Sequence, residues 1–185
     1  MRILSLDAST SSSGWSIFDG KKLISYGCIK SNKKEWRHRI ADMVDEIDKI
    51  IKQDGEIERI YVEDVPLMSA NPQTLKMLCC LQGALLGVAI GNKIYIEFLM
   101  PSAWRKPCGL FDGTKSGTTR AEMKRKSIEL ANKTFGLNLI YKAPTSKFNQ
   151  DDESDSINLG ASVQGVYHYE EKEKKTIGRK ANVKK

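Results

Sequence analysis

Four carboxylates stand where predicted strands end or where a predicted helix begins. Asp7 follows the first apolar segment of the chain, and Glu63 follows Ile-Tyr-Val. Asp152 and Asp155 are three residues apart, which places both on one face of a helix. Ligand sites of α/β sheets lie outside the ends of strands, so we expect these acids to meet in one cluster.

A cluster of carboxylates is typical of a site for hard divalent cations. Crowded acids raise each other's pKa by repulsion, which folding alone does not favour. Mg²⁺ or Mn²⁺ neutralises them, because these ions prefer oxygen ligands. Two such ions about 3.5–4 Å apart activate water on one side of a phosphodiester and stabilise the leaving 3′ oxygen on the other. Because the net charge of +7 favours a polyanionic partner, the pattern predicts phosphodiester hydrolysis.

Each acid also has a simpler interpretation. An Asp at a strand end, such as Asp7, favours a turn. Glu63 is followed by Asp-Val-Pro and would also suit a solvated loop. The acids at 151–153 would complement the N-terminus of a helix. Asp155, deeper in that helix, is harder to explain in this way, and the order of the four acids is more specific than any one of them.

The hydropathy pattern predicts the elements that carry these acids. Period-two alternation and β-rich segments predict five strands, at residues 2–6, 15–18, 23–29, 59–63 and 94–99, with a hairpin turn at Asp19-Gly20. Apolar spacings of three and four, with caps, predict helices at residues 36–51, 72–90, 119–135 and 150–169. We expect an α/β domain, with a mixed five-stranded sheet flanked by helices, over residues 1–169. Residues 170–185 carry a charge of +4 and are expected to form a flexible basic tail.

The composition limits the class of protein. With 185 residues, 40% hydrophobic and 29% charged, the chain is predicted to be soluble and globular. The longest apolar run, at 75–90, is broken by Lys76, Gln82 and two glycines, so no membrane partner is expected. The four cysteines form no CxxC pair, and the adjacent Cys79 and Cys80 are predicted to be buried, reduced thiols. This indicates a reducing, cytoplasmic compartment and no zinc site.

The order of these motifs resembles the RuvC family of Holliday-junction resolvases, within the RNase H-like nuclease superfamily. The resemblance is greatest to the phage-encoded branch from low-GC Gram-positive hosts. It covers about residues 1–167. The matching segments lie at residues 4–9 with Gly14-Trp15, at 60–64, at 82–84, at 101–106 and at 152–157.

The resemblance implies an RNase H-like fold and a specific set of ligands. Asp7, Glu63, Asp152 and Asp155 match the four metal-binding catalytic positions, which implies Mg²⁺ or Mn²⁺ and two ions in the site. The third position is a histidine in some bacterial members, and Asp152 stands there here. Its assignment rests on the spacing to Asp155, and the neighbouring acids at 151 and 153 are close enough to be mistaken for it. No nucleotide cofactor is implied.

The resemblance also implies the partners. Members of the family act as homodimers that cut two symmetric strands of a four-way junction, and the phage branch acts more broadly on branched DNA. The helix at 72–90 is apolar on more than one face, so we expect it at or near the dimer interface. The expected location is the cytoplasm, that of a bacterial host if the chain is phage-encoded.

Basic and aromatic residues beyond residue 100 are candidates for contacts with DNA. Trp104 either stacks on an unpaired base or packs under a helix. Leu67 and Met68, in the segment after Glu63, are candidates for apolar wedges that enter a junction. The cations run from a loop into a helix and either bind phosphates or form a solvated face. They are Arg105, Lys106, Lys115, Arg120 and Lys124.

Three other classes remain open at this point. The segment 7–14 is similar to the phosphate hairpin of actin-like and sugar-kinase ATPases, but that fold needs a second hairpin and usually a second domain, and no Walker loop is present. A ribonuclease H or a transposase would share the acids. A non-catalytic DNA-binding module would tolerate the loss of any one of them. ATP hydrolysis, nicking of an RNA–DNA hybrid and cleavage of a four-way junction separate these classes.

Overall fold

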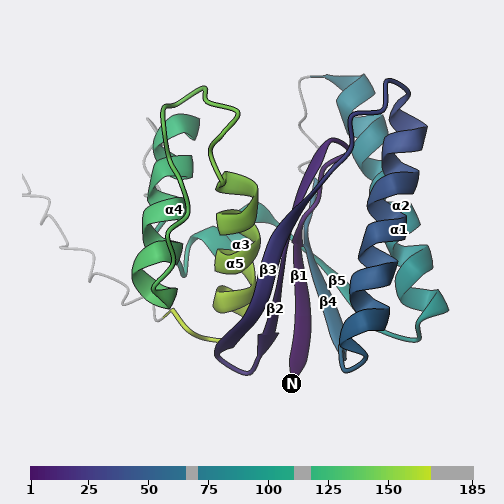
Figure 1. Cartoon of the computed structure of the whole chain (residues 1–185), viewed down its shortest axis with the longest axis horizontal. Helices are drawn as coiled ribbons and strands as arrows, with labels where there is room; N and C mark the ends of the chain where they lie inside the picture. Colours follow the sequence, from purple (N-terminus) through teal and green to yellow (C-terminus); the bar gives the residue numbers. More distant parts are fainter. Residues whose placement is uncertain (66–70, 111–117, 168–185) are drawn as a thin grey trace, which may run out of the picture.

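The computed structural model describes residues 1–65, 71–110 and 118–167, and Figure 1 shows a sheet covered by helices on both faces. The five strands have the order β3-β2-β1-β4-β5. β1 pairs antiparallel with β2 and parallel with β4, so the predicted mixed five-stranded sheet is confirmed. The strands are β1 (Arg2–Asp7), β2 (Ser12–Asp19), β3 (Lys22–Lys30), β4 (Arg59–Glu63) and β5 (Tyr95–Leu99).

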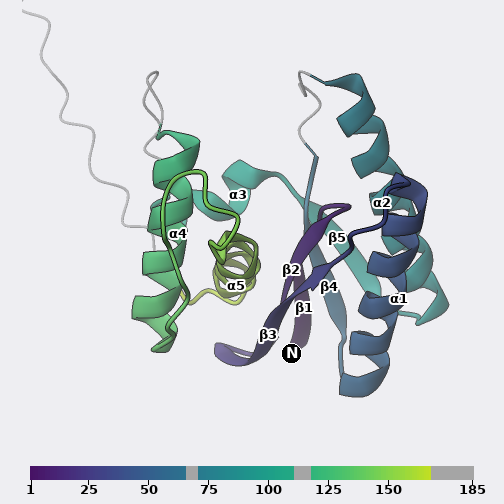
Figure 2. The same cartoon turned by 45° about the horizontal axis from the view of Figure 1, so that its top comes forward.

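The helices form one layer on each face of the sheet (Figures 1 and 2). On one side lie α1 (Trp36–Asp54) and α2 (Pro72–Gly91). On the other lie α3 (Pro101–Arg105), α4 (Arg120–Phe135) and α5 (Asp151–Val163). A hydrophobic core lies on each face of the sheet, and β1 contributes to both because successive side chains of a strand point to opposite faces. Leu4 packs with α1 and α2, and Ile3 packs with α4 and α5.

Two glycines let α5 approach the sheet closely. A Cβ on Gly14 of β2 would lie 1.8 Å from the carbonyl oxygen of Asp152, at the start of α5. A Cβ on Gly160 would lie 2.4 Å from the Ser5 Oγ and 2.7 Å from the Phe18 ring. Contacts this short leave no room for a side chain. The helix α5, which carries two of the candidate ligands, is therefore fixed against the strands.

Several local predictions are confirmed and others need correction. The cap of α4, which the sequence placed at Thr118 or Thr119, is Thr119, whose hydroxyl accepts from the Glu122 N–H. α5 ends at Val163, not at 169, because Gly165 turns the chain with φ 64°. The short helix α3 was not predicted. The basic segment 170–185 lies outside the described residues.

The outer surface of α2 is apolar, as expected for a helix with more than one apolar face, but one prediction for this helix is wrong. Cys79 and Cys80 are exposed, so their predicted burial is wrong. Leu81, Leu85 and Ala89 are buried on the inner side, whereas Leu86 and Ile90 are 43% and 69% exposed. Among the described residues, α2 alone is long and apolar enough to cross a membrane, judged by length and composition only. A one-sided burial of this kind also fits a helix that packs inward and presents its outer face to a partner.

Candidate active site

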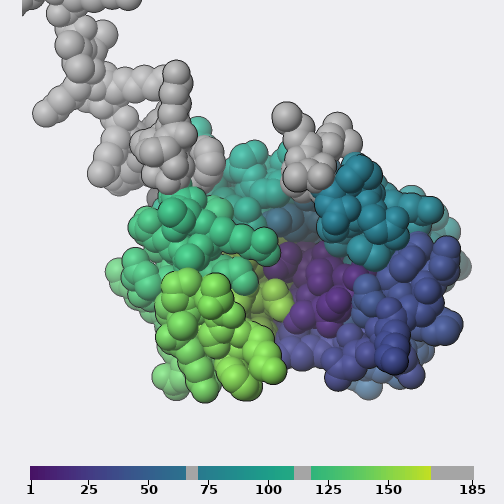
Figure 3. All heavy atoms as spheres, turned by 90° about the horizontal axis from the view of Figure 1, so that it is seen from above, coloured from purple at the N-terminus to yellow at the C-terminus, as the bar shows by residue number. Residues whose placement is uncertain are grey.

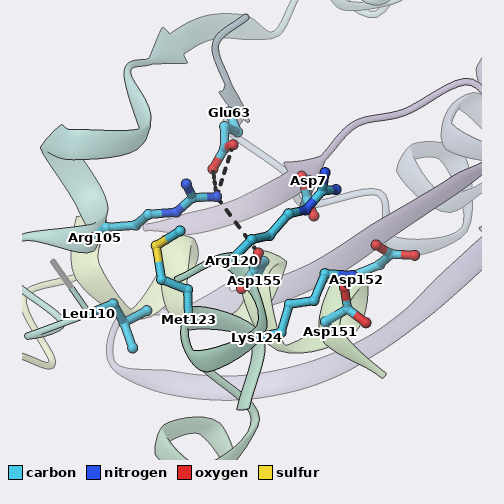
Figure 4. Close-up of a pocket in the computed structure, with 10 residues that line it drawn as sticks. All are labelled: Asp7, Glu63, Arg105, Leu110, Arg120, Met123, Lys124, Asp151, Asp152 and Asp155. Atoms are coloured by element: carbon cyan, nitrogen blue, oxygen red, sulfur yellow. Dashed lines mark hydrogen bonds and ion pairs between the residues drawn. The ribbon is translucent and has the colours of Figure 1, made fainter. Parts of the chain in front are cut away.

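A pocket of about 360 Å³ opens at one end of the sheet. Figure 3 shows the hollow between the α4–α5 side of the molecule and the side formed by α1 and α2, with the N-terminal strands at its base. Figure 4 shows the side chains that line the pocket. They are Asp7, Glu63, Arg105, Leu110, Arg120, Met123, Lys124, Asp151, Asp152 and Asp155.

The fold brings together four acids that are far apart in sequence. Asp7 and Glu63 end neighbouring parallel strands, and the register that pairs Leu6 with Val62 places both at the same edge of the sheet. Asp152 and Asp155 come from the first turns of α5. All four predicted ligands line this one pocket.

The electrostatics of the pocket show a site with excess negative charge. Burial raises the pKa of Asp7 well above its ordinary value, and the charges of Asp155, Glu63 and Asp152 raise it further. Burial also raises the pKa of Asp155, to about 7, although a hydrogen bond from Ser127 and the charge of Arg105 oppose the change. Neutral carboxyls or a bound cation would both relieve this repulsion.

Glu63 is held by two neighbouring residues of α3. The indole Nε1 of Trp104 donates to Glu63 Oε2 at 2.7 Å. Arg105 Nη2 donates to both carboxylate oxygens of Glu63, each at 3.1 Å, and lies 3.8 Å from Asp155 Oδ2. Burial still raises the pKa of Glu63, against the lowering by Arg105 and Trp104.

The acids of α5 have hydroxyl partners that the sequence did not reveal. Ser127 of α4 donates to Asp155 and accepts from Ser154 at 3.0 Å and from Asn158 at 2.9 Å. Ser12 of β2 donates to Asp152 and opposes the rise in its pKa that burial causes. A serine on the apolar face of α4, next to the buried Ile128, was the one signal that could have identified Ser127.

The neighbouring acids at 151 and 153 have separate partners. Asp151 lines the pocket but forms an ion pair with Lys124. Glu153 accepts from Gln150 Nε2 at 3.2 Å and is not among the pocket-lining residues. Asp152 is the acid of this run whose carboxylate contacts β2, on the strand side of the pocket.

Two comparisons match the chain to resolvases, although no protein-family model matches it. The crossover junction endodeoxyribonucleases RuvC of Sulfurovum sp. and Wolinella succinogenes are 35% and 30% identical over 89 and 90 residues. Each alignment covers 46% of this chain, and the chain spans about half the length of these curated relatives, 55% and 54%.

The solved structures extend the similarity to the whole fold. T. thermophilus RuvC in complex with a Holliday junction substrate superposes with a TM-score of 0.65, at 13% identity, over 88% of this chain and 91% of that one. The fowlpox virus resolvase in complex with substrate Holliday junction DNA gives a TM-score of 0.54, at 16% identity, over 90% and 98%. The chain has a RuvC-like fold. At these identities the structural likeness shows the fold, and the predicted RNase H-like architecture is confirmed at that level.

The four candidate side chains are oxygen donors of the kind that fits a hard divalent cation, but they are turned to protein partners. Among the described residues, no group of three or more His, Cys, Asp or Glu is arranged to hold a metal ion in this conformation. Glu63 faces α3, Asp152 faces Ser12 and Asp155 faces Ser127. The candidate ligands are all oxygen donors whose negative charges repel one another, so their chemistry would suit a cation once these contacts rearrange.

The residues predicted to contact DNA differ in where the structure places them. Arg105, Arg120 and Lys124 line the pocket with the acids. Lys106 is exposed at the end of α3 and does not line it. Trp104 is 1% exposed, which favours the second of its two alternatives, packing, and its indole donates to Glu63. Lys115, Leu67 and Met68 lie outside the described residues.

Proposed function

We propose that the chain is a metal-dependent endonuclease that cleaves four-way junctions, and other branched DNA, by phosphodiester hydrolysis. One observation carries this proposal. Five carboxylates from three separate elements, among them the four predicted ligands, line one pocket together with three cationic side chains. The names of the RuvC relatives, and the junction DNA bound by two structural neighbours, support junction DNA as the substrate.

The ligands in this proposal are Asp7, Glu63, Asp152 and Asp155, with Mg²⁺ or Mn²⁺ as the cofactor and two ions in the site. Bound there, such ions would supply an activated water and a stabilised leaving 3′ oxygen. The raised pKa of Asp7, caused by burial and by the three other carboxylates, supports a site built for a cation. The protein itself orients the ligands through hydroxyl and indole donors that lie outside the cluster.

The cations of the pocket would hold the strand to be cut. Arg120 is exposed at the start of α4, and Lys124 lies one turn further along the same helix. Lysine and arginine that neutralise phosphates position a duplex without reading its sequence, and their contribution falls steeply with salt. We therefore expect α4 to set affinity, and the acids to set the rate of cleavage.

We further propose that two copies assemble through α2. The exposed Leu86 and Ile90 continue an apolar surface on the outer side of this helix, with the exposed Cys79 and Cys80 nearby on the same element. Apolar surface that faces solvent is costly, and a two-fold contact buries the same face on both copies. Two sites related in this way would suit the two symmetric cuts of a four-way junction. We expect this assembly to act in the cytoplasm.

A cleavage assay over four substrates tests the proposal. A four-way junction, a replication fork, a linear duplex and an RNA–DNA hybrid of matched length are incubated with Mg²⁺, Mn²⁺ or EDTA. We expect metal-dependent cuts in the junction, weaker cuts in the fork and none in the linear duplex. Preferential cleavage of the hybrid would instead support a ribonuclease. No cleavage of any branched substrate with either metal would contradict the proposed function.

A further inference from the structure

The guanidinium of Arg105 directly contacts two of the candidate metal ligands. Its Nη2 is 3.1 Å from both carboxylate oxygens of Glu63 and 3.8 Å from Asp155 Oδ2. Figure 4 shows the guanidinium between these two acids, with dashed lines to each. The three side chains are 23%, 16% and 17% exposed, so water screens the interaction only in part. A single positive charge is thus shared between two of the four candidate ligands.

The local fold holds Arg105 in this position. α3 directly follows β5, which pairs parallel with β4, so α3 begins beside the strand end that carries Glu63. Trp104 is buried and donates to the same carboxylate, and the Arg105 guanidinium carbon lies 4.9 Å from the centre of the Trp104 ring. A guanidinium over an aromatic face is stabilised by a cation–π interaction. Arg105 is therefore positioned by the structure, unlike a solvated surface cation.

We propose that Arg105 is an internal counter-ion which a divalent cation displaces when it binds between Glu63 and Asp155. This inference rests on the proposed function, because it assumes that these acids bind a metal. The oxygens that accept from the guanidinium are the same oxygens that would coordinate an ion, so both contacts cannot be complete together. Arg105 stabilises the metal-free protein and weakens its affinity for the metal. Once displaced, its guanidinium is free in the pocket to contact a phosphate.

Lys124 provides a matched control in the same pocket. It also carries one positive charge, is similarly exposed at 27%, and pairs with an acid. That acid is Asp151. Among the ion pairs of the described residues, Lys124 contacts neither Glu63 nor Asp155, which pair with Arg105. The loss of Lys124 reports the general effect of removing a positive charge near the acids. The loss of Arg105 adds the removal of a direct competitor.

Binding of Mn²⁺ alone, without DNA, tests the inference. Free Mn²⁺ is measured by electron paramagnetic resonance during titration of the wild type, Arg105→Gln, Arg105→Lys and Lys124→Gln, and circular dichroism checks that each variant is folded. Arg105→Gln removes the hydrogen bonds between a charged guanidinium and Glu63, which compete with the metal. We therefore expect this variant to bind Mn²⁺ about tenfold more tightly than the wild type. We expect Lys124→Gln to tighten binding by less than threefold. Arg105→Lys keeps the charge on a shorter side chain and should lie between the wild type and Arg105→Gln.

Thermal unfolding of the same proteins in EDTA adds a second readout. Without metal, Arg105→Gln should unfold at a lower temperature than the wild type. Saturating Mn²⁺ should raise the unfolding temperature of Arg105→Gln by more than it raises that of the wild type. The counter-ion role would be overturned, with the metal site left intact, if Arg105→Gln bound Mn²⁺ no more tightly than the wild type. It would also be overturned if Arg105→Gln and Lys124→Gln gained equally in Mn²⁺ affinity. If the wild type and every variant failed to bind Mn²⁺, both the inference and the proposed function would be overturned.

Discussion

Replacement of Asp155 by Asn should stabilise the metal-free protein, because the charge of this carboxylate is unfavourable in the folded state. Burial raises the pKa of Asp155 from the ordinary value of 3.8 to about 7, although Ser127 and Arg105 oppose the change. The folded state therefore binds the proton more tightly than the unfolded state does. Stability from this group is present at low pH and is lost as the pH rises from about 4 to about 7.

The size of the effect follows from this difference in pKa. About three pH units at about 1.4 kcal/mol each correspond to an upper limit of about 4 kcal/mol at neutral pH. The amide introduced by Asp155→Asn would still accept from Ser127 through its oxygen, but it would face the guanidinium of Arg105 without a negative charge, which offsets part of the gain. We expect a net increase of about 2 kcal/mol in the free energy of unfolding. For a chain of this size that raises the Tm by about 4–8 °C.

Urea and thermal unfolding in EDTA, from pH 4 to pH 8, measure the effect. Asp155→Asn and the wild type should be about equally stable at pH 4 and should diverge toward pH 7. The matched control is Asp45→Asn on α1, where the side chain is 65% exposed and forms an ion pair with Lys49 at the surface. Its effect should stay within about 0.5 kcal/mol. An Asp155→Asn protein that is no more stable than the wild type at pH 7, or a difference that does not change with pH, would refute the reasoning.

Three further predictions concern the hydrogen bond from Ser127 to Asp155, the proposed dimer and the basic segment at 170–185. Ser127→Ala removes a hydrogen bond that lowers the pKa of Asp155, so the acidic limb of the pH–rate profile should move to higher pH, and an unmoved limb would count against this role. Ile90→Glu places a charge on the outer face of α2 and should convert a dimer to a monomer in sedimentation at micromolar concentration, whereas a wild type that is already monomeric would remove the basis for the interface. Truncation after Tyr169 removes a charge of +4 but no candidate ligand, so metal-dependent cleavage should persist while junction binding weakens at low salt; unchanged affinity and salt dependence would show that the segment does not contribute.

The order of elements and the four acids could be predicted because the signals are local. Strand alternation, the Asp19-Gly20 turn and the cap at Thr119 each depend on a few adjacent residues. The acids were identified as a set because each follows or begins such an element. Their convergence then depends only on β1 and β4 being neighbours and on α5 packing against β1 and β2.

The remaining features depend on contacts between segments that are distant in sequence. Trp104 lies 41 residues from Glu63, and only the pairing of β4 with β5 shows that it is a buried donor to that acid. The sequence of α2 is apolar all round, so it could not show that Cys79 and Cys80 fall on the exposed side. Arg105 was predicted as a cation for DNA, because the sequence could not show that α3 turns it toward the acids.

Cleavage of a four-way junction by Asp7→Asn tests the central claim most directly. Asn has nearly the same volume as Asp, but it removes the carboxylate whose pKa the other three acids raise. In parallel reactions with Mg²⁺, the wild type should cut the junction, whereas Asp7→Asn should bind it with nearly unchanged affinity and leave it intact. Substantial cleavage by Asp7→Asn with Mg²⁺ would contradict the assignment of this pocket as the active site.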